Sequence, residues 1–287
     1  MRALVLFFAA TYATSWASWL AAMRLQQGAA PNHISAAATA LLYLGTFAPA
    51  LIALLTTAVT DGRAGVAALI ARLVQARAGI RWYVFAIGYV AATKLGAAVL
   101  YRATAGAWPA FGAEPLVLVL FAIPFGTPSQ AGEEIGWRGY ALPRIASRVG
   151  FAPASVILGA LWGAWHLPLF FVPGVGNFGQ SFPVFAIMNM ALSIAIAWLY
   201  VNTGGSLLIA MLMHSAVNQT NGIVPTRRST PGMPWRFDTS TITLMAVALF
   251  VASAVYLFAQ LRRLDRVAVR RADGPCIQIA SSLRPSE

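Results

Sequence analysis

The sequence predicts an all-α fold, a polytopic bundle of about eight transmembrane helices with one interfacial amphipathic helix. Of the 287 residues, 59% are hydrophobic and only 10% are charged, and the mean hydropathy is +0.70. Soluble domains average roughly 45–50% apolar and about 25% charged residues, and they need the charged ones to cover their exterior. The chain is therefore expected to be an integral membrane protein surrounded by a lipid bilayer.

Apolar segments recur along the whole chain at the length that a membrane helix requires, about 20 residues for a hydrocarbon core of ~30 Å. The first begins MRALVLFF and is too long for a typical signal peptide, and it lacks a small-residue cleavage context. We expect spans at residues 3–23, 36–60, 81–101, 115–132, 152–172, 183–201, 205–221 and 241–260. Together they form one membrane domain, residues 1–261, without an internal repeat.

The formal net charge of +12 suggests nucleic-acid binding, but the placement of the arginines argues against it. They lie in short connecting segments without the interleaved aromatic residues of a nucleic-acid surface, and cytoplasmic loops of membrane proteins collect such residues. With the N-terminus inside, the cytoplasmic segments carry Arg63, Arg72, Arg77, Arg81, Arg138, Arg144, Arg148, Arg262, Arg263, Arg266, Arg270 and Arg271. The outer segments carry Arg24, Arg102, Arg227, Arg228 and Arg236. Both termini are therefore expected in the cytoplasm.

Two further segments are not expected to span. Residues 63–78 are too charged, yet their apolar residues recur at helical spacing: Val66, Leu69, Ile70, Leu73 and Val74. This pattern predicts an amphipathic helix on the inner leaflet. Residues 262–287 are basic and then rich in Gly, Pro and Ser, which predicts a disordered cytoplasmic tail.

Glu133 and Glu134 are the only acidic residues that lie against an expected span. A charged side chain within a membrane costs roughly 2.5–3.5 kcal/mol on insertion scales and therefore faces a bundle interior or water. On a helix, Glu134 can pair with Arg138 four residues later. Glu133 points about 100° away and has no partner nearby in the sequence. The pair could mark the membrane boundary, or it could supply a catalytic carboxylate.

Two histidines lie within other expected spans. His166 follows Trp162 by four residues, and His214 precedes Asn218 by four, so each pair shares a helix face. A buried imidazole needs a hydrogen-bond partner or a ligand. Together with the glutamates, these residues supply a general base, an imidazole that can hold water and donors for an oxyanion. This set of groups predicts hydrolysis of an amide by activated water.

These elements resemble the CPBP family of intramembrane proteases, also called the Abi or CAAX-protease family, which includes type II CAAX prenyl endopeptidases. The family signature is EExxxR, FxxxH and HxxxN or HxxxD, each on its own helix. Residues 133–138 match the first element and residues 214–218 the third. The second is imperfect because Trp162 stands in place of phenylalanine before His166; we expect it to keep an aromatic wall. The motif core covers residues 115–221.

The resemblance implies a role for each motif residue. Glu133 would activate the attacking water, with His166 helping to position it. Glu134 and Arg138 would support that helix end, and the third motif would stabilise the tetrahedral oxyanion. The substrate would be a peptide or protein that reaches the site from the membrane or the cytoplasm. We expect the carboxylate of Glu133 and the imidazoles of His166 and His214 to converge on one water-accessible pocket within the bilayer.

The family has been described both as metalloproteases and as metal-independent glutamate proteases, so zinc is a candidate cofactor. Glu133, His166 and His214 could fill three zinc positions and leave one open. The HExxH motif, which gives zinc proteases two ligands on one helix face, is absent from the sequence. A glutamate desolvated among Trp137, Trp162 and Trp165 can activate water without metal. We favour the metal-independent mechanism.

Other functions remain open at this stage. A transporter or channel could use Glu133, His166 and His214 to relay protons or bind a cation. A scaffold could use the same polar residues only to fasten helices together. The arginine-rich and nearly lysine-free composition favours a bacterial origin, and hence a bacterial cytoplasmic membrane.

Overall fold

The computed structural model describes residues 2–26, 34–112, 115–220, 233–237 and 239–272. These residues form helices and no strands, which confirms the predicted all-α fold. The α-helices are α1 (Arg2–Leu25), α2 (Ala36–Thr60), α3 (Gly62–Ala71), α4 (Ile80–Ala105), α5 (Leu116–Gly126), α6 (Ala131–Glu134), α7 (Leu142–Val149), α8 (Phe151–Trp165), α9 (Phe182–Asn202), α10 (Leu207–Gln219) and α11 (Thr241–Ala272). Short 3₁₀ segments are η1 (Arg72–Val74), η2 (Pro128–Gln130) and η4 (Leu167–Phe171), and η3 (Ile135–Ala141) is a π-helix.

Six of the helical segments in the described residues are long and apolar enough to cross a membrane. They are α1, α2, α4, α8 continued by η4, α9 and α11. The other two expected spans are shorter helices, since α5 has 11 residues and α10 has 13. Pro128 follows the end of α5, and α10 begins only after Gly204 and Gly205, which both have positive φ. The polytopic prediction is thus confirmed, with two membrane segments shorter than expected.

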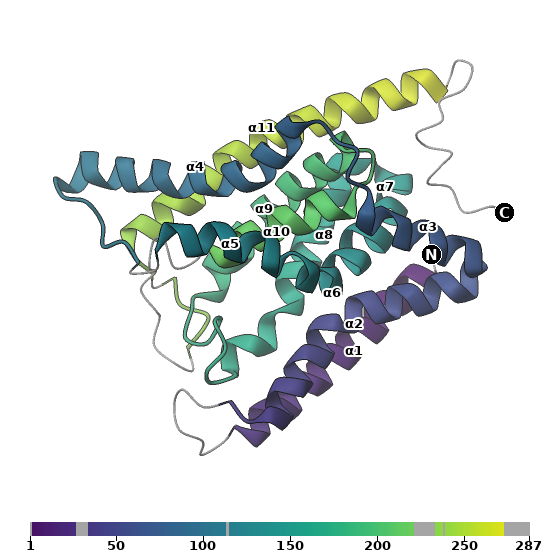
Figure 1. Cartoon of the computed structure of the whole chain (residues 1–287), viewed down its shortest axis with the longest axis horizontal. Coiled ribbons are helices and arrows are strands. Elements are labelled where there is room, and N and C mark those ends of the chain that lie inside the picture. The colour runs from purple at the N-terminus through teal and green to yellow at the C-terminus, as the bar shows by residue number, and fades with distance from the viewer. Residues whose placement is uncertain (1, 27–33, 113–114, 221–232, 238, 273–287) are drawn as a thin grey trace.

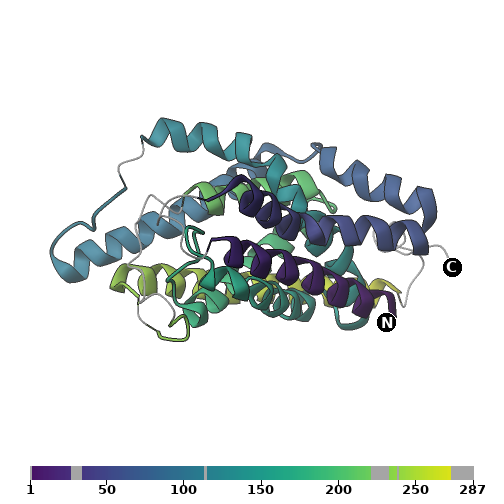
Figure 2. The same cartoon turned by 90° about the horizontal axis from the view of Figure 1, so that it is seen from below.

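The helices form a central group flanked by two pairs (Figure 1). Helices α8, α9 and α10 lie at the centre, and α10 is packed by α4, α5, α6 and α9. The α1–α2 pair lies along one flank, and both views show these two helices side by side (Figure 2). Helix α11 packs against both α4 and α9. On the central helices, Ser155 of α8 and His214 and Ser215 of α10 are buried, whereas Asn218 near the end of α10 is exposed.

A proline within α2 allows a hydrogen bond between α1 and α2. Pro49 lies inside α2 and has no N–H, so the carbonyl of Gly45 four residues earlier lacks its usual helical partner. Ser15 Oγ of α1 donates to this carbonyl at 2.7 Å. A Cβ at Gly45 would lie only 2.3 Å from the Trp19 ring, so the glycine allows α1 to approach closely. The Gly45 carbonyl, which Pro49 leaves unpaired within α2, thus forms a hydrogen bond between the two helices.

Helix α2 also packs closely on the segment that carries the glutamates. A Cβ at Gly136 in η3 would lie 2.6–2.7 Å from Pro49 atoms, including its backbone. One turn earlier, a Cβ at Gly132 would meet the Phe47 ring at 3.0 Å. These two glycines let α2 cover the glutamate segment.

The amphipathic helix predicted over residues 63–78 is present but ends at residue 74, as α3 followed by η1. Leu69 is buried, and a Cβ at Gly139 of η3 would lie 2.6 Å from its Cδ1, so α3 rests on the glutamate segment. Ile70 and Val74 are instead exposed, at 48% and 77%. The helix therefore uses only part of its apolar face to pack on the protein, and its place at the membrane interface remains a prediction.

The prediction of a disordered tail from residue 262 is wrong for residues 262–272, which continue α11. The physical reason is a tertiary contact. Both carboxylate oxygens of Asp265 accept backbone N–H groups at the start of α8, from Phe151 at 2.8 Å and from Ala152 at 2.9 Å. Asp265 satisfies two donors that a helix start leaves free. Residues 273–287, and the loop arginines Arg227 and Arg228, lie outside the described residues.

Candidate active site

The two glutamates lie at the junction of α6 and the π-helix η3, where every residue from 132 to 142 is buried. The N–H of Leu142 bonds to the carbonyl of Trp137 five residues earlier, and Pro143 has no N–H to restore the α-helical pattern. Because charged groups can be buried only when they are paired, each charged side chain here needs a partner.

Glu134 forms a buried ionic network with two other residues. Its Oε1 accepts from Arg138 Nη1 at 2.8 Å, and both side chains have no exposed surface. The same oxygen lies 2.8 Å from Nδ1 of His214 on α10. Because a carboxylate paired with arginine is ionised and only accepts, His214 Nδ1 carries the proton in this contact. The predicted Glu134–Arg138 pair is confirmed, and it joins the first motif to the third.

Glu133 points to α8 instead. Its Oε2 accepts from the indole Nε1 of Trp162 at 2.6 Å and lies 4.0 Å from Nε2 of His166. The gap to His166 is too long for a direct hydrogen bond, but one water molecule can contact both atoms. The side chains of His166 and Glu133 retain 13% and 9% exposure, whereas Glu134 and Arg138 retain none. The Glu133–His166 pair therefore retains some exposed surface, whereas Glu134 and Arg138 behind it have none.

The protonation of His166 follows from the end of α8. In the last turn, the backbone N–H of His166 bonds to Gly163 instead of continuing the α-helical pattern, which leaves the carbonyl of Trp162 free. His166 Nδ1 lies 2.8 Å from that carbonyl and must donate, because the carbonyl only accepts. In the neutral ring, Nε2 is then an unprotonated acceptor on the side of Glu133.

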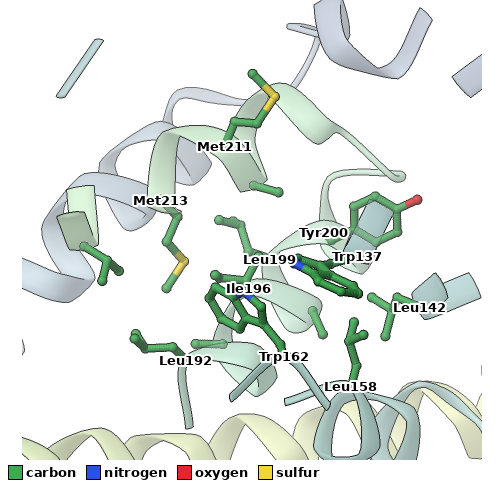
Figure 3. Close-up of a cluster of buried hydrophobic side chains, with 14 of the residues drawn as sticks. Trp137, Leu142, Leu158, Trp162, Leu192, Ile196, Leu199, Tyr200, Met211 and Met213 are labelled. Atoms are coloured by element: carbon green, nitrogen blue, oxygen red, sulfur yellow. The ribbon is translucent and has the colours of Figure 1, made fainter. Parts of the chain in front are cut away.

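Trp162 lies between the two histidines. Its ring centroid is 5.8 Å from that of His166 and 5.2 Å from that of His214, and the guanidinium carbon of Arg138 lies 4.4 Å above it. Figure 3 shows Trp162 in a buried cluster with Leu192 and Ile196 of α9. Glu133 of α6, His166 at the end of α8 and His214 of α10 thus lie around one indole ring.

Asn218 lies one turn beyond His214 and makes a contact that the sequence did not predict. Its Nδ2 donates to Oε1 of Gln130 at 3.1 Å. Gln130 is buried and precedes Glu133 by three residues. The polar stretch TPSQAGEE was the available signal, because a glutamine beside an apolar span needs a partner just as the glutamates do.

A further polar residue near the site is Lys94, the only lysine in the chain, which no sequence motif indicated. It lies within α4, and its Nζ donates to Thr220 Oγ1 at the end of α10, at 3.0 Å. A cation near the C-terminal end of a helix is electrostatically favourable. Its position inside an expected span was the signal that could have identified it.

The N-terminal helix also supports the site. Trp16 Nε1 of α1 donates to the carbonyl of Trp165 at 2.9 Å, and Tyr12 Oη donates to the carbonyl of Leu161. Both carbonyls belong to the last turn of α8, where His166 is held. Residues before 110, in which the sequence offered no motif, therefore help to hold a motif residue.

The proposed zinc ligands do not form a ligand set as they lie. Glu133 approaches His166, whereas His214 is engaged by the other glutamate, Glu134. Across the described ranges, no three His, Cys, Asp or Glu side chains are grouped as a metal site requires.

Fold and site together define a polytopic helical membrane protein with buried carboxylates and histidines from three helices. Residues 113–220 match the model of the type II CAAX prenyl endopeptidase Rce1-like family. The chain is also 28% identical over 152 residues to CAAX prenyl protease 2 of Methanococcus maripaludis, covering 51% of this chain and 52% of that protein. The match thus spans about half the length of the curated relative. The motif-bearing part of the chain is thus similar to type II CAAX prenyl endopeptidases.

Proposed function

We propose that the protein is an intramembrane endopeptidase that hydrolyses a peptide bond with water activated by Glu133 and His166. The observation that carries the proposal is the pairing of these two side chains, from different helices, at 4.0 Å and with residual exposure. Behind them lies a fully buried charge network. A partly hydrated base in front of a rigid ionic support is the arrangement that general-base catalysis needs.

The chemical steps follow from these groups. Glu133 takes a proton from a water held against His166 Nε2, and the resulting hydroxide forms a bond to the peptide carbonyl carbon. The oxyanion receives hydrogen bonds from His214 and Asn218. Glu133 then returns the proton to the nitrogen of the departing amine as the C–N bond breaks. Each group acts in turn without a change in net protonation of the enzyme.

The role of His214 carries one chemical requirement. Its Nδ1 proton faces Glu134, so only Nε2 is left to face substrate. Nε2 can donate to an oxyanion only when the ring carries both protons. Glu134 on the opposite nitrogen fixes the orientation of the ring, as a carboxylate does behind a catalytic imidazole. Glu134 thus acts in the proposal as a positioning residue.

The substrate class is proposed from the family match. The relative from Methanococcus maripaludis is a CAAX prenyl protease. We propose a peptide substrate that enters from the membrane or the cytoplasmic side, and prenylated and unprenylated peptides ending in a CAAX sequence distinguish whether the lipid is required. Localisation in a bacterial cytoplasmic membrane remains part of the same proposal.

The function is tested with purified protein in detergent, offered a peptide library together with both CAAX peptides. We expect cleavage by the wild-type protein and a loss of at least about 100-fold in kcat for Glu133→Gln, because general bases contribute roughly 10²–10⁴-fold. His166→Ala and His214→Ala are expected to lose activity as well. Wild-type rates in all three variants would refute the assignment.

Two further arms of this experiment address the alternatives. Dialysis against a chelator is expected to leave kcat unchanged, since no step uses a metal; loss of activity with recovery on adding Zn²⁺ would contradict the metal-free mechanism. Reconstituted liposomes are expected to show no proton or cation flux that depends on Glu133. Such a flux, without any peptide cleavage, would favour the transporter interpretation instead.

A further inference from the structure

The residue that connects the parts of the site is Trp162, which the sequence suggested only as an aromatic wall. Its indole N–H donates to Glu133 Oε2 at 2.6 Å. Among the described residues, it is the only group that hydrogen-bonds the Glu133 side chain. Phenylalanine, the residue of the FxxxH pattern, has no N–H and cannot make this bond.

The hydrogen bond is held in place from several sides. Trp162 is 2% exposed and packed among buried side chains of α9 and α10 (Figure 3). Its ring lies under the guanidinium of Arg138, at 4.4 Å, and edge-on to His214. Because Arg138 is itself fixed by Glu134, the indole cannot rotate without disturbing the buried ionic network. The donor is therefore preorganised toward Glu133.

The bonded oxygen is the one that faces His166. Glu133 Oε2 receives the indole proton and also lies 4.0 Å from His166 Nε2. A hydrogen bond to this oxygen sets the orientation of the whole carboxylate, and hence the place where a water can contact both Glu133 and His166. Without the donor, the carboxylate would be free to change rotamer.

We propose that Trp162 is a positioning residue for hydrolysis, and that it acts through the hydrogen bond from its indole N–H to Glu133. This inference rests on the function proposed above. It assigns to this chain a device that phenylalanine at the same place in the motif could not provide. The ring would supply packing, and the nitrogen would orient the base.

The test replaces the indole in two ways. Trp162→Phe removes the N–H and part of the ring, and replacement of Trp162 by β-(3-benzothienyl)alanine removes the N–H but keeps a bicyclic ring of nearly the same size. Hydrogen bonds to charged groups contribute about 1.5–3 kcal/mol, so we expect kcat to fall about 10- to 100-fold in both variants, with KM changed less than about twofold.

Trp165→Phe is the matched control. Trp165 lies on the same helix, is 1% exposed and contacts His166 at a centroid distance of 4.7 Å. Its indole nitrogen is buried and has no hydrogen-bond partner among the described residues. The substitution removes the same atoms from the same region without removing a hydrogen bond to Glu133, so any loss of kcat reports on packing alone and is expected to be smaller than the loss in Trp162→Phe.

The outcomes separate this inference from the proposed function. Wild-type cleavage by Glu133→Gln would show that the proposed function fails, and the positioning role with it. Loss of activity in Glu133→Gln, combined with a wild-type kcat in the benzothienyl variant, would overturn the positioning role alone. A spectroscopic readout is independent of turnover: the ¹H–¹⁵N resonance of the Trp162 indole is expected to shift in Glu133→Gln, and an unchanged resonance would also refute the bond.

Discussion

At the scale of single residues, the two adjacent glutamates have different surroundings because they lie about 100° apart on the helix. Glu134 faces inward to Arg138 and His214 without any exposed surface. Glu133 faces α8, where Trp162 and His166 meet it and some exposure remains. The sequence motif pairs the two residues, but the structure gives one an ionic partner and the other a partly exposed position beside Trp162 and His166.

The Glu134–Arg138 pair provides a stability prediction. Arg138→Met leaves the carboxylate of Glu134 buried without its guanidinium, and breaking a buried pair in this way costs about 3–5 kcal/mol. We expect a large decrease in the thermal unfolding midpoint in detergent, followed by intrinsic fluorescence. The double variant Arg138→Met with Glu134→Gln is expected to recover most of the loss, because no charge is stranded and the amide oxygen still accepts from His214.

The unsatisfied polar atoms of the Glu134–Arg138 pair give a second reason to expect recovery in the double variant. Arg138 Nε and Nη2 and Glu134 Oε2 have no hydrogen-bond partner among the described residues, so the pair is incompletely satisfied. Removing both charges therefore removes unsatisfied groups as well. A single variant as stable as wild type would show that the ion pair contributes nothing to folding.

At the scale of elements, the site depends on a close approach of α2 to the π-helix η3. Gly136→Ala would place a Cβ 2.6–2.7 Å from Pro49, including its backbone carbonyl carbon and oxygen. Backbone atoms cannot move aside cheaply, so we expect a destabilisation of about 1–3 kcal/mol, as for other overpacked cores. The measurement is the thermal midpoint in detergent, together with the fraction of protein that elutes as a single species.

Gly88→Ala is the control for this element. Gly88 lies within α4, and a Cβ there would meet no atom within 4 Å. Alanine is the better helix former, so the substitution should leave the midpoint unchanged or raise it slightly. Equal effects of the two substitutions would mean that the close approach at Gly136 is not what matters.

Element prediction from the sequence succeeded where apolar runs were long and failed at their ends. All eight expected spans contain a helix, but α5 and α10 are short because Pro128 and the Gly204–Gly205 pair limit them. The extension of α11 to residue 272 could not be predicted, because composition does not reveal that Asp265 would cap α8. The π-helix depends on packing around it and was not foreseen either.

At the scale of the whole molecule, the distribution of arginines predicts which end of the helix bundle faces the cytoplasm. Helices α3 and α7 lie at the same end of the molecule, and Asp61 at the α2–α3 corner pairs with Arg144 of α7 at 2.5 Å. Figure 1 shows that α4 ends at the opposite end. By the positive-inside rule, we expect the α3–α7 end to face the cytoplasm.

This orientation is tested by cysteine labelling in intact cells, in a background where the only native cysteine is removed by Cys276→Ser. Ser147 of α7 and Ala107 beyond α4 are both exposed, and each is replaced by cysteine in turn. A membrane-impermeant maleimide should label Ala107→Cys in intact cells and Ser147→Cys only after lysis. The reverse pattern would contradict the proposed topology.

The sequence by itself determined the all-α membrane fold and the identity of the motif residues, because apolar length, charge placement and residue spacing are properties of the chain alone. It also predicted the Glu134–Arg138 pair, since four residues along a helix bring two side chains to one face. Only the tertiary structure decided which partner from another helix each motif residue meets. His214 lies 80 positions from Glu134, and Trp162 lies 29 positions from Glu133, so both contacts arise from helix packing that no local pattern encodes.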